Sequence, residues 1–326
     1  MSRDSLVGTV VIGRNEGERL IACLNSIPKE TGNVVYVDSG STDNSVARAQ
    51  DLGALVVQLD MTQPFTAARA RNAGFKRLVS EGKFDFVQFV DGDCSIQSEW
   101  YATARDFLLD NPKAAVVCGR RRERFPERTV YNRLCDIEWD TPIGQADACG
   151  GDAMMRVKAI EEVDGYRDTM IAGEEPELCV RLRAKGWQVW RLDAEMTLHD
   201  ADITHLGQWW KRARRSGHAF AEGAALHGAQ PERHSVQALR RILLWGAALP
   251  LWLILAALLV SPWMWLGFLV YPLQVFRIAR RDGLSQQMAW ERAFFLVLGN
   301  FPETMGVFEF YLRRLRGKPA GIIEYK

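Results

Sequence analysis

One uninterrupted apolar stretch constrains this chain more than any other feature of its sequence. From Ile242 to Phe276 the 326-residue chain carries no charged side chain over 35 positions. A stretch this long and uniform is typical of membrane sequence and not of a helix in a soluble core. As one helix it would run to roughly 52 Å, well beyond a hydrocarbon core of about 30 Å, and Ser261-Pro262 interrupts it near the middle. The sequence therefore predicts a hairpin over 242–276.

Arginines flank both ends of this hairpin. Arg240 and Arg241 precede it, and three more arginines follow it closely. The positive-inside rule places both ends in the cytoplasm, so the hairpin either crosses the membrane twice or inserts partly as a re-entrant loop. The second arm, 263–276, is shorter than a usual spanning helix. A buried helical pair in a soluble protein is the remaining interpretation.

Amphipathic segments adjoin the hairpin on both sides. After it, apolar side chains recur at near-helical spacing over about 288–316, but three glutamates in this segment would be costly at mid-bilayer. We therefore expect an interfacial helix there. Before it, residues 205–220 combine a tryptophan pair with four basic side chains. That pattern is typical of a solvated helix face or of a helix on a membrane surface.

The composition of the chain narrows its class. With 48% hydrophobic and 25% charged residues the chain can bury a core, and a formal net charge of +1 gives no reason to expect a nucleic-acid partner. Six cysteines show neither a C-x-x-C pair nor a zinc spacing, and no signal-peptide-like stretch precedes the first predicted strand. We expect reduced thiols, a cytosolic domain over 1–225 and a membrane-associated helical region over 226–326.

The N-terminal region alternates apolar strands with helix-forming segments. The predicted strands are short runs rich in β-formers: 7–13, 33–40, 54–59 and 84–90. The predicted helices lie between them and carry capping residues or helical periodicity: 16–27, 41–53 and 66–82. This order predicts an α/β fold with a mostly parallel, Rossmann-like sheet and helices on both faces.

Acidic residues follow two of the predicted strands. Asp38 lies at the carboxyl end of the second strand, while Asp91 and Asp93 follow the fourth, with Gly92 between them. Ligands of such sheets bind at the carboxyl ends of the strands, and Mg²⁺ is typically held by one or two carboxylates together with phosphate oxygens. A turn or a helix cap explains an isolated Asp-Gly-Asp equally well. The position of the Asp-Gly-Asp motif at the carboxyl end of a strand, more than the motif itself, therefore favours a metal site.

Six short motifs in a fixed order carry a resemblance to a known family. Between about residues 7 and 220 the chain reads VVIGRNEGERL, VDSGSTDNS, ARARNAG, FVDGDC, CGGDAMMR and GEEPELCVRLRAKGW. Together these motifs resemble glycosyltransferase family 2, and within it the membrane-attached bacterial polysaccharide-assembly type. The resemblance implies an inverting, nucleotide-sugar-dependent enzyme with the type A glycosyltransferase fold.

The resemblance implies a site for a UDP- or GDP-linked donor. Asp38 resembles the carboxylate that accepts a hydrogen bond from the nucleotide base, a role suited to an acceptor-only group. Arg71 resembles a residue that faces the donor, and its guanidinium can bind phosphate. The other implied donor-site residues wall the base pocket, adjoin the metal or border the donor sugar: Ile12, Arg14, Asn15, Glu16, Asp91, Gly92, Gly151 and Asp152.

The resemblance also implies a metal and a catalytic base. Asp91 and Asp93 resemble the pair that binds Mn²⁺ or Mg²⁺, and His199 stands where many relatives supply a third ligand, although a lone histidine also suits a structural role. The run GEEPEL resembles a Gly-Glu-Asp-x-Glu-Leu signature whose aspartate is the base, and Glu175 occupies that position. Because glutamate is one methylene longer, Glu174 remains a second candidate. A helix N-terminus also explains these acids.

The arginine-rich run 119–133 has three interpretations: binding of a lipid diphosphate, attraction to anionic headgroups, or a solvated loop. We expect a metal-dependent inverting glycosyltransferase at the inner (cytoplasmic) membrane, with its catalytic domain facing the cytoplasm and membrane lipids as partners. The expected acceptor is a polyprenyl-diphosphate-linked oligosaccharide in surface or exopolysaccharide biosynthesis. Alternatives are a polyprenyl-phosphate monosaccharide synthase, a nucleotidyltransferase and a membrane-anchored scaffold without enzymatic activity.

Overall fold

The computed structural model describes residues 6–29, 31–283 and 285–317. The chain divides into two compact units, one up to Asp202 and one from Ile203 onward. The division falls before the amphipathic segment 205–220, which the sequence pattern assigns to the cytosolic domain. The functional boundary at 225/226 stays a prediction. The final stretch of the predicted membrane-associated region, 318–326, lies outside the described residues.

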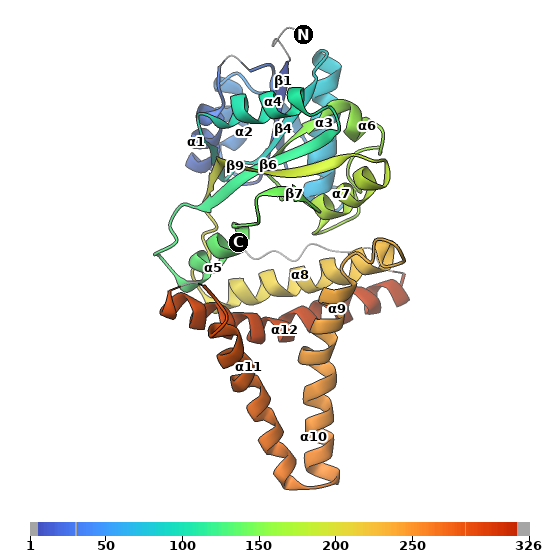
Figure 1. Ribbon diagram of the computed structural model, residues 1–326. Coiled ribbons are helices and arrows are strands. Elements are labelled where there is room, and N and C mark those ends of the chain that lie inside the picture. Colours follow the sequence, from blue (N-terminus) through green and yellow to red (C-terminus); the bar gives the residue numbers. More distant parts are fainter. Residues whose placement is uncertain (1–5, 30, 284, 318–326) are drawn as a thin grey trace. The chain divides into compact units, whose positions relative to one another are not determined.

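The first unit is an α/β structure built on one sheet, coloured from blue to yellow in Figure 1. Its described strands are β1 (Val7–Gly13), β2 (Val34–Asp38), β3 (Leu55–Gln58), β4 (Phe86–Asp91), β5 (Cys94–Ile96), β6 (Ala114–Glu123), β7 (Gly144–Ala146), β8 (Ala153–Arg156) and β9 (Gln188–His199). Its described helices are α1 (Glu18–Ser26), α2 (Ser45–Asp51), α3 (Ala67–Glu81), α4 (Trp100–Asp110), α5 (Val130–Trp139), α6 (Val157–Glu161) and α7 (Glu174–Ala184).

The sheet has a parallel half and a mixed half. Strands β3, β2, β1 and β4 lie side by side and are all parallel, as the alternating sequence pattern predicts. Strand β8 then runs antiparallel to both β4 and β6, and β6 pairs in parallel with β9. The short strands β5 and β7 pair antiparallel with β9. The α/β fold expected from the sequence is thereby confirmed.

The core of this unit explains why the parallel strands read as nearly continuous apolar runs. A strand covered on both faces has no solvent side, so it carries apolar residues at every position. Strand β1 is buried from Val7 to Ile12, and β4 is buried from Phe86 to Val90. Inside the sheet, the Gln88 side chain accepts a hydrogen bond of 2.7 Å from the indole of the fully buried Trp100. The polar residues that follow these strands consequently lie at one edge of a rigid layer.

The second unit consists of helices in its described part. They are α8 (Leu206–His227), α9 (Val236–Leu243), a π-helical turn η1 (Leu244–Ala248), α10 (Leu249–Leu259), a 3₁₀ helix η2 (Pro262–Leu269), α11 (Val270–Ala279) and α12 (Gln286–Leu315). Helices α8 and α12 run alongside each other, and α10 and α11 form the two arms of a hairpin (Figure 1). A Cβ added to Gly306 of α12 would lie 1.9 Å from the Arg214 carbonyl oxygen of α8. Glycine at this position therefore permits close packing of the two backbones.

One continuous helical segment, Val236–Leu259, is long and apolar enough to cross a membrane, with a mean hydropathy of 2.4 over its most apolar window. It comprises α9, η1 and α10. Most of the apolar part of this helical segment is not buried against the rest of the chain. The helical hairpin and the helix predicted at about 288–316 are both present, and neither observation by itself shows attachment to a membrane.

Candidate active site

The carboxyl ends of three neighbouring strands bring the predicted site residues together. Residue Ile12 of β1 lies opposite Asp91 of β4, and Gly13 lies opposite Asp38 of β2. The Gly92 amide donates a hydrogen bond of 2.8 Å to the Ile12 carbonyl oxygen. The Asp-Gly-Asp turn is therefore tied to the end of β1, at the edge of the sheet where the sequence predicts a ligand site.

The loops after β1 and β2 are joined by hydrogen bonds. Asn15, with a left-handed φ of 56°, donates its backbone N–H to the Ser41 hydroxyl at 2.8 Å and accepts the Thr42 N–H on its side-chain oxygen at 2.7 Å. Asp38 is buried, and its carboxylate accepts hydrogen bonds from the amides of Gly40 and Ser41 at 3.0 Å each. It also accepts one from the Tyr36 hydroxyl at 3.1 Å.

Two other predicted pocket residues, Arg14 and Glu16, follow β1 directly. The Arg14 guanidinium lies 5.8 Å from the centroid of the Phe65 ring. Glu16 forms an ion pair of 2.8 Å with Arg19. Arg14 therefore contacts the segment before α3, whereas Glu16 contacts α1.

A single guanidinium connects the acidic residues of two motifs. Arg71, on α3, is almost fully buried. Its Nη2 lies 2.8 Å from Asp91 Oδ1, and its Nη1 lies 2.9 Å from Oε1 of both Glu174 and Glu175. The fork that the sequence assigns to a phosphate is therefore occupied by three carboxylates of the protein.

Glu175 has an unusual protonation equilibrium. It lies in the first turn of α7, whose N-cap residue, Gly173, has a left-handed φ of 78°. Burial, followed by the neighbouring Glu174 carboxylate, raises the pKa of Glu175 to about 7, although the Arg71 guanidinium acts in the opposite direction. A carboxylate with a pKa near neutrality is suited to accept a proton from an attacking hydroxyl.

A second, partly buried arginine lies on the other side of Asp91. Arg121, from β6, places its Nη2 3.4 Å from Asp91 Oδ2 and its Nε 3.6 Å from Asp152 Oδ2. Asp152 is buried and accepts hydrogen bonds from the Asp91 amide at 3.1 Å and from the Thr197 hydroxyl at 2.8 Å. Asp152 therefore supports the Asp91 backbone from beneath the site.

The backbone at Gly151 passes directly against this charged cluster. A Cβ at Gly151 would lie 2.5 Å from Arg71 Nη2, 3.0 Å from Asp91 Oδ2 and 3.3 Å from Glu175 Oε1. Only a residue without a side chain fits this approach. The loop before β8 therefore contacts the residues predicted for donor binding and for catalysis at the same time.

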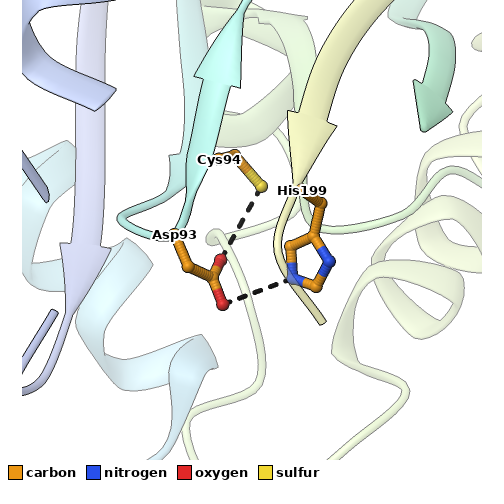
Figure 2. A group of neighbouring side chains, drawn as sticks. All are labelled: Asp93, Cys94 and His199. Atoms are coloured by element: carbon orange, nitrogen blue, oxygen red, sulfur yellow. Dashed lines mark hydrogen bonds and ion pairs between the residues drawn. The ribbon is translucent and has the colours of Figure 1, made fainter. Parts of the chain in front are cut away.

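Asp93 points to a different group of side chains, shown in Figure 2. His199, at the end of β9, places Nε2 3.3 Å from Asp93 Oδ2, and Cys94 Sγ lies 3.7 Å from Asp93 Oδ1. Ligand atoms of these three residues lie within 4.8 Å of one another. The Cys94 thiol also donates to Asp152 Oδ2 at 3.2 Å. Burial, followed by the Asp152 carboxylate, raises the pKa of this thiol well above its usual value, so the sulfur stays protonated.

These residues fit a hard divalent cation. A carboxylate and an imidazole close together are ligands of Mn²⁺, and the protonated Cys94 is not a ligand because metals bind the thiolate. The cluster also carries more negative than positive side chains. Its guanidinium groups belong to Arg71 and Arg121, whereas its carboxylates belong to Asp91, Asp93, Asp152, Glu174 and Glu175. A bound cation would offset this excess.

A comparison with protein families finds a match to the part of the chain that carries much of this geometry. Residues 9–164 match the model of glycosyl transferase family 2, a range that includes most of β1, the Asp-Gly-Asp turn and Gly151. The matched part, just under half of the chain, belongs to glycosyl transferase family 2. The matched range ends before Glu174, Glu175 and His199, so their roles rest on the geometry and on the motif resemblance.

Curated relatives share part of this glycosyltransferase. The chain is 28% identical over 136 residues to a TPR repeat-containing protein of Synechococcus elongatus. This alignment covers 42% of this chain and 32% of that protein. The chain is also 25% identical over 200 residues to a pre-mycofactocin glycosyltransferase of Mycobacterium tuberculosis. That alignment covers 58% of this chain and 40% of that protein. The chain thus spans about a third to two fifths of the length of these relatives.

A solved structure shares the fold. A mannosyltransferase from Pyrobaculum calidifontis, in complex with GDP-Man and Mn²⁺, superposes with a TM-score of 0.58 at 17% identity, covering 97% of this chain and 89% of that chain. At this level of identity the likeness concerns the fold alone. It agrees with the type A glycosyltransferase fold expected from the motifs.

Two residues at the site of this glycosyltransferase were missed in the sequence. Arg121 belongs to the arginine-rich run, whose first part is the end of buried strand β6 and not a solvated loop. The Trp139 ring lies beside both groups of the site, 4.8 Å from the Arg121 guanidinium and 4.7 Å from the His199 ring. The only available signal was that the apolar run 114–118 leads into the arginines without a turn residue other than Gly119.

Proposed function

We propose that this glycosyltransferase transfers a sugar, with inversion, from a nucleotide-linked donor to a lipid-linked acceptor of polyprenyl-diphosphate oligosaccharide type in surface or exopolysaccharide biosynthesis. One observation carries the reaction: Glu175, with its pKa near 7, contacts the same guanidinium as Asp91 at the carboxyl edge of the sheet. A proton acceptor and the predicted donor-phosphate site are therefore adjacent.

In this proposal Glu175 accepts the proton of the acceptor hydroxyl as the oxygen attacks the anomeric carbon. Arg71 holds Glu175 and Asp91 at fixed positions, since a guanidinium binds carboxylates in a rigid planar fork. Glu174 contributes negative charge that keeps the pKa of Glu175 high. Asp38 and the loop Ile12–Glu16 form the predicted pocket for the base.

The proposed cofactor is Mn²⁺ or Mg²⁺, held by Asp93 and His199, with Asp91 as the third predicted ligand. When bound, such a cation neutralises charge that develops on a departing diphosphate. The Mn²⁺ in the P. calidifontis mannosyltransferase supports this choice, and its GDP-Man makes a GDP-linked sugar the first donor to examine.

The lipid-linked acceptor is supported by the second unit. Its long apolar helix and arginine-flanked hairpin favour attachment to the inner (cytoplasmic) membrane, with the catalytic unit in the cytoplasm. A lipid-linked acceptor is confined to that surface, so an attached enzyme encounters it without a search through the bulk solution.

The test is a donor screen with membranes that contain the full chain. Labelled GDP- and UDP-sugars are supplied with and without chelator, and both donor turnover and lipid-extractable product are measured. We expect one donor to be consumed, turnover to stop with chelator and to return with Mn²⁺. Asp93→Asn should lose turnover at subsaturating Mn²⁺, while the exposed Asp51→Asn should behave as wild type.

The products separate the alternatives. A labelled polyprenyl-phosphate monosaccharide identifies the synthase alternative, and release of pyrophosphate from a nucleoside triphosphate and a sugar phosphate identifies a nucleotidyltransferase. Turnover that persists fully in chelator contradicts the metal-dependent proposal.

A further inference from the structure

The two arms of the hairpin have the same apolar length, although their residue numbers differ. The first arm, 242–259, has 18 residues, or about 27 Å at 1.5 Å per residue. In the second arm, η2 is a 3₁₀ helix of 8 residues with a rise of about 2.0 Å, and 270–276 adds an α-helical stretch. Their sum is again roughly 27 Å. The short second arm thus reaches as far as the first because part of it is stretched.

Both ends of the hairpin are fixed to the same helix. Arg241 contacts the Asn300 side-chain oxygen at 2.7 Å and Glu303 at 2.9 Å, both on α12. At the other end, Asp282 forms an ion pair of 2.6 Å with Arg292, also on α12. Both ends of the hairpin are therefore anchored on α12.

Near its α12 end the hairpin pairs a free backbone carbonyl group with its other arm, and both arms expose apolar side chains. Pro250 has no N–H to donate to the π-helical turn, and the Tyr271 hydroxyl of the other arm donates to the Trp245 carbonyl oxygen at 2.7 Å. The outward surface carries leucines on both arms: Leu251, Leu255, Leu258, Leu266, Leu269 and Leu273. This is the surface expected in hydrocarbon, where backbone groups need partners within the protein.

The tip of the hairpin has the opposite character. Helix α10 ends at Leu259 and η2 begins at Pro262, so the last carbonyl groups of α10 lack the N–H donors of a further helical turn. Such groups are costly inside hydrocarbon and are hydrated in the interface. Trp263 and Trp265 are 77% and 49% exposed, and tryptophan is enriched at membrane–water interfaces. The tip therefore fits a polar interface and not the bilayer centre.

We propose that the hairpin crosses the bilayer completely, with α12 at the cytoplasmic interface and the Ser261-Pro262 tip in the opposite interface. The arm length of about 27 Å matches a hydrocarbon core of about 30 Å, with basic residues beyond the apolar part at both ends. The occupant of the exposed apolar surface is a phospholipid bilayer. This inference rests on the membrane attachment in the proposed function and decides between two crossings and a re-entrant loop.

Cysteine labelling tests this topology. All six native cysteines are buried, so the wild-type chain provides a low background. Ser261→Cys reports on the tip, and Val260→Cys, at a residue that is 78% exposed, provides a second tip position. The matched control is Gly283→Cys beyond the second arm, where an added Cβ meets nothing within 4 Å. A membrane-impermeant maleimide is applied to right-side-out spheroplasts and to inverted membrane vesicles, and total reactivity is measured in detergent.

We expect at least tenfold more labelling of the tip cysteines in spheroplasts than in inverted vesicles, and the reverse for Gly283→Cys. Tip labelling from the cytoplasmic side, or labelling only after detergent, overturns the complete crossing and identifies a re-entrant loop. Equal labelling from both sides with release of the protein by alkaline carbonate overturns it in favour of a soluble assembly. Sugar transfer is measured on the same vesicles, so loss of the proposed reaction is distinguished from a wrong topology.

Discussion

Arg71 is the residue whose removal should disturb the site most. It is buried, and its guanidinium is shared by Asp91, Glu174 and Glu175. Breaking a buried ion pair is strongly destabilising because the remaining charges lose their partner while they stay out of water. Here one substitution would leave three carboxylates in that condition.

We therefore predict that Arg71→Met lowers the free energy of unfolding by about 3–5 kcal/mol at pH 7. Arg77→Met is the control on the same helix, since Arg77 is partly exposed and pairs with Glu81 four residues on. The control should change the free energy of unfolding by less than about 1 kcal/mol. Urea denaturation measures both. Equal stability of the two variants would show that the carboxylates do not depend on Arg71.

The raised pKa of Glu175 predicts a pH dependence of the reaction. Because a base must be ionised to accept a proton, kcat/KM should rise with pH up to about 7 and level off above it. At pH 6 about a tenth of Glu175 would be ionised, so kcat/KM should be about tenfold below the plateau.

The matching variants are Glu175→Gln and Glu174→Gln. The first should reduce kcat at least about 100-fold and leave nucleotide binding nearly unchanged. The second should keep most of kcat and shift the rise to lower pH, because a neighbouring negative charge is removed. If Glu174→Gln shows the larger loss, Glu174 is the base. Full activity of Glu175→Gln removes the assignment.

Residue identities could be predicted from sequence only where a motif fixed them. Asp91, Glu175 and Gly151 were found because the turns that carry them have a recognisable pattern. Arg121 and Trp139 were not found, because each reaches the site through tertiary pairing of β6 and through α5, and no local pattern encodes either contact. The roles of all these residues remain predictions.

At the scale of elements, the loop before β8 is the part of the site with the least room. Gly151 lies against Arg71, Asp91 and Glu175, whereas a Cβ at Gly150 meets nothing within 4 Å. The two glycines are adjacent and therefore form a natural pair of test and control.

We predict that Gly151→Ala lowers kcat/KM by roughly tenfold or more, because the new methyl group displaces Arg71 or Asp91, and overpacking typically costs about 1–3 kcal/mol. Gly150→Ala should retain wild-type transfer. Both are measured with the donor identified in the screen, together with the melting temperature. Similar activity of the two variants would mean that the loop moves away from the cluster without cost.

Elements differed in how well the sequence predicted them. The strands and helices up to β4 were predicted because each apolar run is bounded by caps or turn residues. The second half of the sheet was not, since β8 reverses direction and β9 holds three partners, and both depend on pairing between distant segments. The end of strand β6 was interpreted as a possible loop because of its arginines. A single sequence does not show that these arginines are paired with acidic residues inside the fold.

For the whole molecule, the sequence predicted two different parts, one α/β and one helical with a long apolar hairpin. Both parts exist, as units that divide after Asp202. The apolar stretch was informative because a run without charge has few physical explanations. What sequence could not supply was the 3₁₀ geometry of Pro262–Leu269, on which the equal reach of the two arms depends.

Attachment of both arms to α12 has a mechanical consequence. In the proposed topology, arms that are longer than the hydrocarbon thickness around them would tilt, whereas shorter arms would thin the bilayer locally. Because both arms are anchored on α12, a helix of 30 residues, a change in their tilt would rotate that helix. In the proposed topology, the orientation of α12 would therefore depend on the acyl-chain length of the surrounding lipids.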